Sequence, residues 1–190
     1  LLGEFIYLDD PERNYFANTQ HKYLVTQNQY MNQTIESGST RASVDMHFNH
    51  PVKEFLVYGR TATNTAARAW FNFKGLEPIT GAYYEELFTS MGITLNGNIR
   101  VAPRDPLYYR VLQNQQHHTR IPSKHIYTYS LALSPEQPSP TGQINLSRIE
   151  NARLDFTFTL TTDPIDLCVQ VRNLNVVTIG GGVAQVKWAS

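Results

Sequence analysis

Residues 153–161 read RLDFTFTLT, and this stretch decides which fold class the chain is expected to adopt. Polar side chains, Asp155 and three threonines, alternate in it with the apolar side chains of Leu154, Phe156, Phe158 and Leu160. A period of two sends one set of side chains to the buried face of a β-strand and the other set toward solvent. The stretch therefore predicts a half-buried strand whose four apolar side chains face the core.

The same strand signal recurs along the chain. Val44, Met46 and Phe48 alternate with polar residues, and runs rich in β-branched and aromatic residues predict strands at 4–8, 21–30, 52–59, 69–73, 125–133, 166–179 and 183–188. Turn sequences such as NGN at 96–98, PRDP at 103–106 and GGG at 180–182 separate these runs. Many short strands with irregular connections favour an all-β, antiparallel, eight-stranded jelly-roll sandwich.

Helical signal is confined to two segments. Residues 10–19 have Pro11 placed for a first helical turn after Asp10, and residues 80–92 have Thr80 as a cap and Gly92 as a stop. One or two short helices are therefore expected in the connections, and the longest should be one of these two.

Composition limits the functions that the chain can have. Its 190 residues, 41% of them apolar, suffice for one domain over 1–190 with a single core. Lys plus Arg number 16 and so do Asp plus Glu, so the formal net charge of zero argues against direct binding to nucleic acid. No apolar run approaches the roughly 18 residues of a membrane span. The first residue is not Met, which favours a fragment or a processed chain.

Sequence patterns that would indicate catalysis or metal binding are weak. Cys168 stands alone between apolar neighbours and is expected to be a small buried hydrophobe in a reducing compartment. His47 and His50 lie three apart on an expected strand, so alternation sends them to opposite faces, while His117 and His118 lie in the polar run QNQQHHTR, an expected solvated loop. Neither a metal-ligand cluster nor a G-x-S-x-G elbow is present. We therefore expect no enzyme activity, no metal and no cofactor.

A proline-rich corner follows the strand expected at 125–133. In PEQPSPTGQINLSRIE (135–150) the prolines fix the backbone entering the turn, Gly142 permits a positive backbone angle, and a strand is expected to begin near Ile144. Arg148 would lie in that strand. It could be an ordinary exposed arginine, but we favour a structural clamp whose guanidinium binds loop carbonyls or a carboxylate such as Glu136.

Residues 118–154 as a whole resemble a signature segment of the major capsid proteins of nucleocytoplasmic large DNA viruses, of the iridovirus, phycodnavirus and asfarvirus type. In that family a strand of the kind I-Y-x-Y-S-F-A-L is followed by P-E, a Q-P-S-G corner and N-F-S-R-I. The matching residues here are Ile126, Tyr127, Tyr129, Ser130, Ala132, Leu133, Pro135, Glu136, Gln137, Pro138, Ser139, Gly142, Asn145, Ser147, Arg148 and Ile149.

Earlier segments resemble the same family in the same order. FIYLDDPERNYFANTQHKYLVTQNQ (5–29) is similar to Y-I-Y-L-D-x-x-E-R-R-x-F-A followed by H-E-Y-L-I, and NHPVKEFLVYGR (49–60) is similar to H-P-V-K-E-L-x-W. The chain departs from the family pattern at Tyr58, where Trp is usual, and at Pro140 and Thr141, which lengthen the corner.

The resemblance implies a fold, a function and partners. Members of the family fold as two consecutive jelly rolls, so residues 1–190 are expected to be the second jelly roll of a longer subunit. The implied function is that of a structural virion protein, whose homotrimers of pseudo-sixfold outline tile an icosahedral shell with neighbouring capsomers and minor capsid proteins after assembly in the host cytoplasm. The structural motif residues implied are Gln137, Pro138, Ser139, Gly142, Asn145, Ser147 and Arg148.

An alternative from another functional class is a carbohydrate-binding jelly-roll module, since such sandwiches often bind sugars through aromatic and amide side chains. This alternative predicts an exposed aromatic platform beside a groove. The candidate side chains are Tyr7, Tyr83, Tyr84, Tyr108 and Tyr109.

Overall fold

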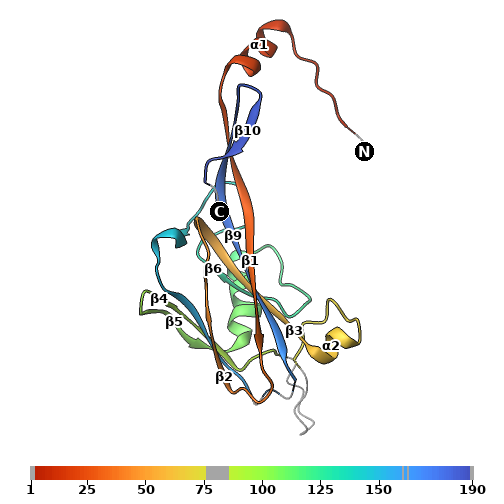
Figure 1. Cartoon of the computed structure of the whole chain (residues 1–190), viewed down its shortest axis with the longest axis vertical. Coiled ribbons are helices and arrows are strands. Elements are labelled where there is room, and N and C mark those ends of the chain that lie inside the picture. The colour runs from red at the N-terminus through yellow and green to blue at the C-terminus, as the bar shows by residue number, and fades with distance from the viewer. Residues whose placement is uncertain (1–2, 76–85, 160, 162, 189–190) are drawn as a thin grey trace.

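A computed structural model of the chain describes residues 3–75, 86–159, 161 and 163–188. Within these ranges the chain forms ten strands and a few short helices (Figure 1). The strands are β1 (His21–Ile35), β2 (Arg41–Asp45), β3 (Pro51–Thr61), β4 (Ser90–Leu95), β5 (Asn98–Arg104), β6 (Tyr127–Ser130), β7 (Ile144–Asn145), β8 (Ala152–Thr157), β9 (Ile165–Gly180) and β10 (Val183–Val186). The helices are α1 (Asp10–Asn18), α2 (Ala62–Ala66), the π-helix η1 (Tyr108–Leu112), α3 (Gln113–His117) and the 3₁₀ turn η2 (Leu146–Arg148).

The strands form two antiparallel sheets in jelly-roll order. One sheet follows the path β1-β9-β3-β6, with β7 paired to β3 and β10 paired to β9, and the other follows β2-β8-β4-β5. The chain crosses repeatedly between the sheets, so that β1 and β2, or β8 and β9, lie in different layers, as in a jelly roll. The predicted all-β antiparallel jelly roll is confirmed. The predicted number of eight strands is wrong, because the short β7 and β10 bring the total to ten.

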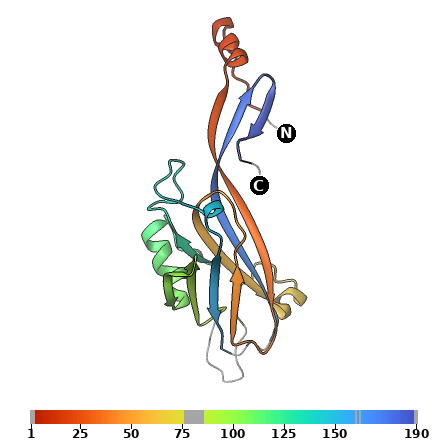
Figure 2. The same cartoon turned by 60° about the vertical axis from the view of Figure 1, so that its left-hand side comes forward.

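Two strands continue far beyond the sandwich as a projecting arm (Figures 1 and 2). β1 pairs with β9 over its whole length, from His21 opposite Ile179 to Ile35 opposite Ile165. In the arm β10 joins β9, and α1 lies at the tip. The turn between β9 and β10 has positive φ at Gly181 and Gly182, as expected for GGG. We call residues 10–26 and 174–186 the arm.

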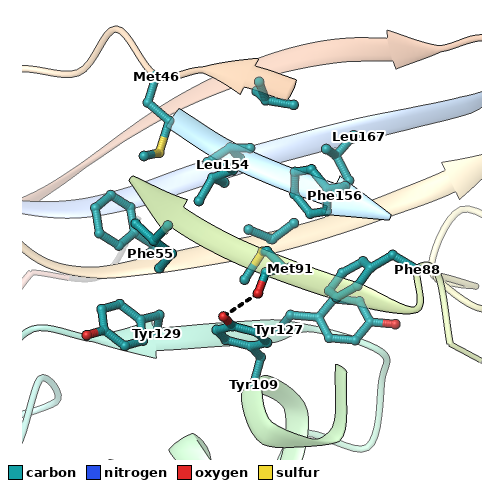
Figure 3. Packing of buried hydrophobic residues seen from close by; sticks show 14 of the residues in the cluster. Met46, Phe55, Phe88, Met91, Tyr109, Tyr127, Tyr129, Leu154, Phe156 and Leu167 are labelled. Carbon is teal, nitrogen blue, oxygen red and sulfur yellow. Dashed lines mark hydrogen bonds between the residues drawn. The ribbon is translucent and has the colours of Figure 1, made fainter. Parts of the chain in front are cut away.

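The core lies between the sheets, and β8 presents to it the face that alternation predicts (Figure 3). Leu154, Phe156 and Phe158 are 0%, 2% and 4% exposed. The Phe156 ring packs edge-on against Phe88, with ring centroids 5.2 Å apart. The predicted face of the strand at 153–161 is therefore confirmed for these three positions, and Leu160 lies outside the described residues.

Two buried tyrosines connect the core to neighbouring backbone. Tyr109 Oη donates to the carbonyl oxygen of Met91 at 2.7 Å (Figure 3), and Tyr127 Oη accepts from the Leu87 amide at 2.8 Å. Burial raises the pKa of both hydroxyls far above that of free tyrosine. Both groups therefore remain neutral hydrogen-bonding groups that fix the positions of the segments they join.

Helix α1 forms where residues 10–19 predict it. The cap is Asp9 and not Asp10, because the Asp9 carboxylate accepts from the Glu12 amide at 3.0 Å. The helix predicted at 80–92 lies partly outside the described residues, and its end is wrong, because residues 90–92 belong to β4.

The longest helical run among the described residues, Pro106–His117, was not predicted. It contains η1 and α3, and it lies between β5 and β6. Asp105 caps its start by accepting from the Leu107 amide at 2.8 Å, and Pro106 occupies the first turn. The sequence PRDP, interpreted as a turn, therefore marks the start of a helix.

Other elements also differ from the predictions. Residues 4–8 and 69–73 form no strand, and the hairpin of β4 and β5 around the predicted turn at 96–98 was missed. Cys168 is half-buried and not buried, because it lies opposite Tyr58 on the face of β9 that points away from the core. Burial and the neighbouring Cys168 raise the pKa of Tyr58 to about 12.

Candidate functional site: the corner loop and the polar cluster beneath it

The motif residues surround one loop, which connects β6 to β7. We call residues 131–143 the corner loop. Gln137, Pro138 and Ser139 are all exposed at its tip. They make the tip a surface that another chain could contact, and they take no part in the core.

The base of the corner loop is closed by hydrogen bonds and by a glycine. The Ser134 amide donates to Thr141 Oγ1 at 2.9 Å, and Thr141 Oγ1 donates to the Ser134 carbonyl oxygen at 3.2 Å. A Cβ atom at Gly142 would lie 2.7 Å from the carbonyl oxygen of Leu131 and 3.1 Å from the Ala132 Cα. Glycine is therefore required by close approach of the backbone, and Thr141, which lengthens the corner relative to the family pattern, closes the loop.

Asn145 and Ser147 attach the end of the corner to the turn that precedes β3. Asn145 Oδ1 accepts from the Ser147 amide at 3.1 Å and so caps η2. Ser147 Oγ accepts from the His50 amide at 2.8 Å, and the Leu146 amide donates to the His50 carbonyl oxygen at 3.0 Å. The strand expected to run from Ile144 is therefore only β7, and a 3₁₀ turn follows it.

Arg148 does not clamp the corner loop from within the chain. It is exposed at the last position of η2 and makes no hydrogen bond or ion pair with any residue that the structure describes. Glu136, its expected partner, accepts from the amide and the hydroxyl of Thr119, each at 3.3 Å. The cation that holds the loop is Lys53, 1% exposed, whose Nζ donates to the Gln137 carbonyl oxygen at 3.2 Å.

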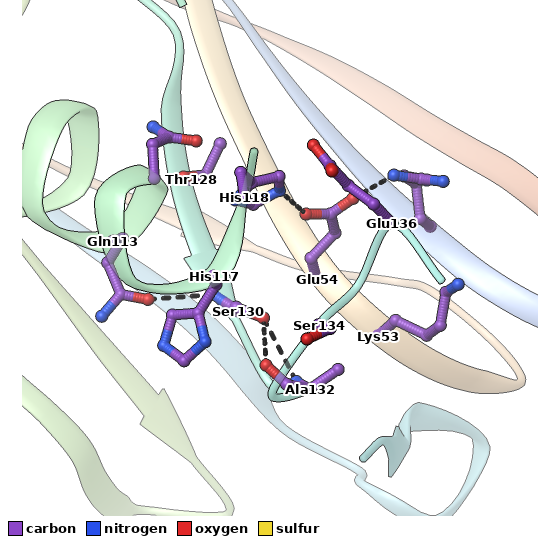
Figure 4. Close-up of polar contacts among 12 residues, drawn as sticks. Lys53, Glu54, Gln113, His117, His118, Thr128, Ser130, Ala132, Ser134 and Glu136 are labelled. Atoms are coloured by element: carbon purple, nitrogen blue, oxygen red, sulfur yellow. Dashed lines mark hydrogen bonds and ion pairs between the residues drawn. The ribbon is translucent and has the colours of Figure 1, made fainter. Parts of the chain in front are cut away.

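Glu54, next to Lys53 on β3, is the centre of a buried polar cluster (Figure 4). It is 0% exposed. Its Oε2 lies 2.7 Å from His118 Nε2, and its Oε1 accepts from Arg172 Nη1 at 2.7 Å. Arg172 lies directly opposite Glu54 on β9, and His118 follows α3. One carboxylate thus joins three segments that are far apart in the sequence.

An irregularity in β3 buries these neighbouring charged residues. The pairing of β3 with β9 shifts register between Val52 and Glu54, and the four consecutive residues from Val52 to Phe55 are all buried. A bulge breaks the alternation of faces along a strand. Both Lys53 and Glu54 can therefore be enclosed, although regular alternation would send one of them to the opposite face.

The charges of the cluster shift each other's proton affinity. Burial alone would raise the pKa of Glu54, but the hydrogen bond and charge of His118 and the charge of Arg172 outweigh it, so the pKa lies below its usual range. Burial lowers the pKa of Lys53, Arg172 lowers it further, and Glu54 opposes both. Glu54 is thus held as the carboxylate that compensates the neighbouring cations.

Further hydrogen bonds hold α3 against β6 and the corner loop (Figure 4). Gln113 Oε1 accepts from the Ser130 amide at 3.1 Å, and Ser130 Oγ donates to the Ala132 carbonyl oxygen at 2.6 Å. His117 Nδ1 lies 3.0 Å from the Leu133 carbonyl oxygen. The run QNQQHHTR (113–120), predicted to be a solvated loop, is therefore a helix over 113–117. Gln113, Asn114 and His117 contact the protein, while Gln115 and Gln116 are exposed.

The histidines and acidic residues gather at no metal site in the part of the chain that the structure describes. His47 is exposed and His50 is buried, but neither lies on the strand that was expected there, because β2 ends at Asp45 and β3 begins at Pro51. Among the described helices, none has the length and apolar composition needed to cross a bilayer.

The tyrosines proposed for a carbohydrate platform do not form one in the described structure. Tyr109 is buried, Tyr108 is half-buried on the helical run, and Tyr7 is 94% exposed on the segment before α1. Tyr83 and Tyr84 lie outside the described residues. The described tyrosines therefore do not favour the carbohydrate-binding alternative.

Comparison with known proteins agrees with the resemblance seen in the sequence. The family model described as the large eukaryotic DNA virus major capsid protein matches residues 12–184. The major capsid protein of Pyramimonas orientalis virus is 30% identical over 213 residues, covering 100% of this chain and 48% of that protein. That of Paramecium bursaria Chlorella virus 1 is 32% identical over 198 residues, covering 92% of this chain and 45% of that protein. The chain thus spans about half the length of these relatives.

Solved structures show the same fold. A quasi-atomic model of the PBCV-1 virus capsid superposes with a TM-score of 0.80 at 24% identity, over 97% of this chain and 55% of that one. The Faustovirus major capsid protein gives a TM-score of 0.70 at 15% identity, over 89% of this chain and 36% of that one. With the family model matching most of its length, the chain belongs to the major capsid protein family of large eukaryotic DNA viruses.

Proposed function

We propose that this chain is the second jelly roll of a major capsid protein subunit, and that the subunit forms homotrimeric, pseudo-hexameric capsomers in an icosahedral shell. Two similar jelly rolls in each of three subunits would give six similar units around a threefold axis, which can pack hexagonally. The role is structural and needs no catalytic step or cofactor. Its other partners are neighbouring capsomers and minor capsid proteins, its location is the virion, and assembly takes place in the host cytoplasm.

The observation that carries the proposal is the uncovered arm. Tyr23, Leu24, Val183 and Val186 are 48%, 51%, 61% and 43% exposed. More than half of the exposed large hydrophobic side chains in the described residues lie on the arm or within a few residues of it. A narrow ribbon of strands is not stable alone, and clustered exposed apolar side chains mark surfaces that associate. The arm therefore suits a protein whose surface is completed by other chains.

The corner loop supports the same role. Its exposed tip residues have no function in the core, yet its base is fixed by Lys53, Ser134 and Thr141. A rigidly held, uncharged tip is suited to contacts between subunits, because few side chains must be ordered or charges desolvated when it is buried. Within this proposal Arg148, free within the described chain, contacts a neighbouring jelly roll or subunit.

The test is the assembly of an intact subunit expressed from the complete gene. Sedimentation velocity at micromolar concentration should show a trimer. Leu24→Ser and Val183→Ser should weaken it, because each removes an apolar side chain from the arm. Phe71→Ser is the matched control, since Phe71 is 73% exposed but lies outside the arm.

The proposal fails if the intact wild-type subunit sediments as a monomer. The proposed role of the arm in trimer formation is contradicted if both arm variants form trimers as well as the Phe71→Ser control does. Circular dichroism of each variant checks that the exposed substitutions leave the fold intact.

A further inference from the structure

The arm joins the body of the sandwich at a gap in the pairing of β9. One edge of β9 pairs with β1 along its whole length. The other edge pairs with β3 only as far as Asn173 and with β10 only from Val177 to Gly180. Residues 174–176 of β9 therefore have a strand on one side only. A two-stranded ribbon is strongly twisted and only marginally stable alone, so we expect the arm to bend at this gap unless another segment supports it.

Two residues that follow β10 fill the gap, and we call Lys187 and Trp188 the strap. The Lys187 amide donates to the Val176 carbonyl oxygen at 2.7 Å. The Trp188 amide donates to Asn175 Oδ1 at 3.2 Å, and Asn175 Nδ2 donates to the Trp188 carbonyl oxygen at 2.8 Å. The Asn175 side chain, 1% exposed, thus pairs with the strap as the backbone of a neighbouring strand would.

The strap also contacts the body of the sandwich. The Trp188 ring stacks on the His50 ring, with ring centroids 6.3 Å apart and planes inclined by 24°. His50 directly precedes β3, and its backbone is held by η2, because its amide donates to Ser147 Oγ and its carbonyl oxygen accepts from the Leu146 amide. Its φ of 70° lies in the left-handed region, which a residue with a side chain keeps only where the surrounding contacts determine it. The strap therefore rests on a ring whose position is fixed by the body.

Asn175 connects the strap to the opposite side of the arm. Its Nδ2 also donates to Gln27 Oε1 on β1 at 2.9 Å, and its Oδ1 also accepts from the Val176 amide at 2.8 Å. One buried side chain thus joins β1, β9 and the strap where the arm leaves the sandwich. Figures 1 and 2 show β10 returning from the tip of the arm toward the body, which brings the strap to this place.

We propose that the strap and Asn175 form a joint that holds the arm at one angle to the body. The closed strap supplies the third element beside residues 174–176, so that arm and sandwich move together. Opening the strap leaves a two-stranded ribbon that bends. The joint is poised to open, because all four residues of β10 are exposed and Trp188 is 36% exposed, so that few buried contacts must break.

A fixed angle has a consequence for association. An arm that is already held in place loses little conformational freedom when another chain covers it, so the contact is stronger than one made by a freely moving arm. The joint is a property of this chain alone. Its use, which is to present the apolar side chains of the arm to other capsid chains, rests on the proposed function.

Distances between spin labels on the arm and on the body test the joint. The labels are attached at Lys22→Cys on the arm and at Arg41→Cys on β2, both exposed positions. The parent chain also carries Cys168→Ser, which removes the free thiol. Double electron–electron resonance should give a narrow distribution of label distances in this parent chain, because the closed strap fixes the arm.

Two substitutions at the joint should broaden the distance distribution. Asn175→Ala removes the amide that pairs with the strap, and Trp188→Ala removes the ring that stacks on His50. Trp70→Ala is the matched control, since Trp70 is 51% exposed and lies against Arg60, outside the arm. The control should keep the narrow distribution of the parent.

Hydrogen exchange shows whether a broadened distribution comes from the joint or from unfolding. In Asn175→Ala the amides of residues 176–180 should exchange about tenfold faster, since a hydrogen bond contributes about 0.5–1.5 kcal/mol, and a tenfold change corresponds to about 1.4 kcal/mol. The amides of β8, in the core, should stay protected in every variant over the same period.

The inference is overturned if the distribution is already broad in the parent chain, or if both joint variants keep the parent distribution. If β8 loses its protection in Asn175→Ala, the partly exposed Trp188→Ala decides the test. A broadened distribution together with a monomeric intact subunit would support the joint and contradict the proposed function. A trimeric intact subunit whose arm keeps its distribution in both joint variants would do the reverse.

Discussion

Replacing Glu54 by Gln should destabilise the chain strongly, although the two side chains have nearly the same shape. Glu54 is 0% exposed and forms contacts of 2.7 Å with both His118 and Arg172. A hydrogen bond to a charged group contributes about 1.5–3 kcal/mol, and removing one partner of a buried ion pair costs about 3–5 kcal/mol. Glutamine keeps one oxygen acceptor. The Arg172 side chain is 30% exposed, so water can solvate part of the guanidinium that loses its carboxylate partner. We therefore expect a loss of about 2–4 kcal/mol in the free energy of unfolding.

The dependence on pH gives the prediction a second signature. The folded-state pKa of Glu54 lies below its usual range, so the unfolded chain binds the proton more readily. The stability that Glu54 contributes is therefore complete above the unfolded pKa of about 4.3 and is lost as the pH falls through the lower folded pKa. The difference between wild type and Glu54→Gln should accordingly be largest near neutral pH and shrink in acid.

Urea unfolding followed by circular dichroism at several pH values measures both effects. Glu136→Gln is the matched control, since it is the same substitution at an exposed glutamate that accepts from Thr119, and it should cost less than about 1 kcal/mol. A loss below about 1 kcal/mol for Glu54→Gln, or a difference from wild type that stays constant into acid, would refute the reasoning.

Three further substitutions are expected to have distinct outcomes. Phe156→Ala should cost about 3–5 kcal/mol in urea unfolding, because the ring is 2% exposed in the core, and a loss under about 1 kcal/mol would contradict the assigned face. Gly142→Ala should cost about 1–3 kcal/mol, because the new Cβ would lie 2.7 Å from the Leu131 carbonyl oxygen, and thermal unfolding equal to wild type would rule out that clash. Arg148→Lys should leave the stability of the isolated chain unchanged but lower the trimer yield of the intact subunit, because a point charge cannot replace the planar fork of donors in arginine. An unchanged trimer yield in both Arg148→Lys and Arg148→Ala would contradict a role of Arg148 in assembly.

Alternation predicted those strands whose two faces have clearly different surroundings. β8 has the core on one side, so Leu154, Phe156 and Phe158 identify its buried face without knowledge of any other segment. The signal for the start of α1 is equally local, because Pro11 and the neighbouring aspartates mark a first helical turn. Such features depend on residues a few positions apart, which the sequence places side by side.

The helical run at 106–117 could not be predicted, because it buries polar side chains and exposes apolar ones. Gln113 and Asn114 are 4% and 1% exposed, whereas Leu107 and Leu112 are 49% and 41% exposed. Gln113 and Asn114 face inward because the Ser130 amide and the carbonyl oxygens of the preceding turn supply their hydrogen-bonding partners. A helix with polar side chains buried and leucines exposed gives no ordinary amphipathic signal.

The polar cluster could not be predicted from local sequence, because the partners of Glu54 lie 64 and 118 positions away, at His118 and Arg172. Its members nonetheless lie largely within the two segments, 49–60 and 118–154, that carry the resemblance to the family. The segments meet directly, through Lys53 and the Gln137 carbonyl and through His50 and Ser147. Lys53 and Ser147 contribute their side chains to these contacts, whereas Gln137 and His50 contribute backbone groups, so each segment depends on one side chain for its attachment to the other. The two signatures are therefore one structural unit, in which the strand at 49–60 supplies the buried charges that hold the corner in place.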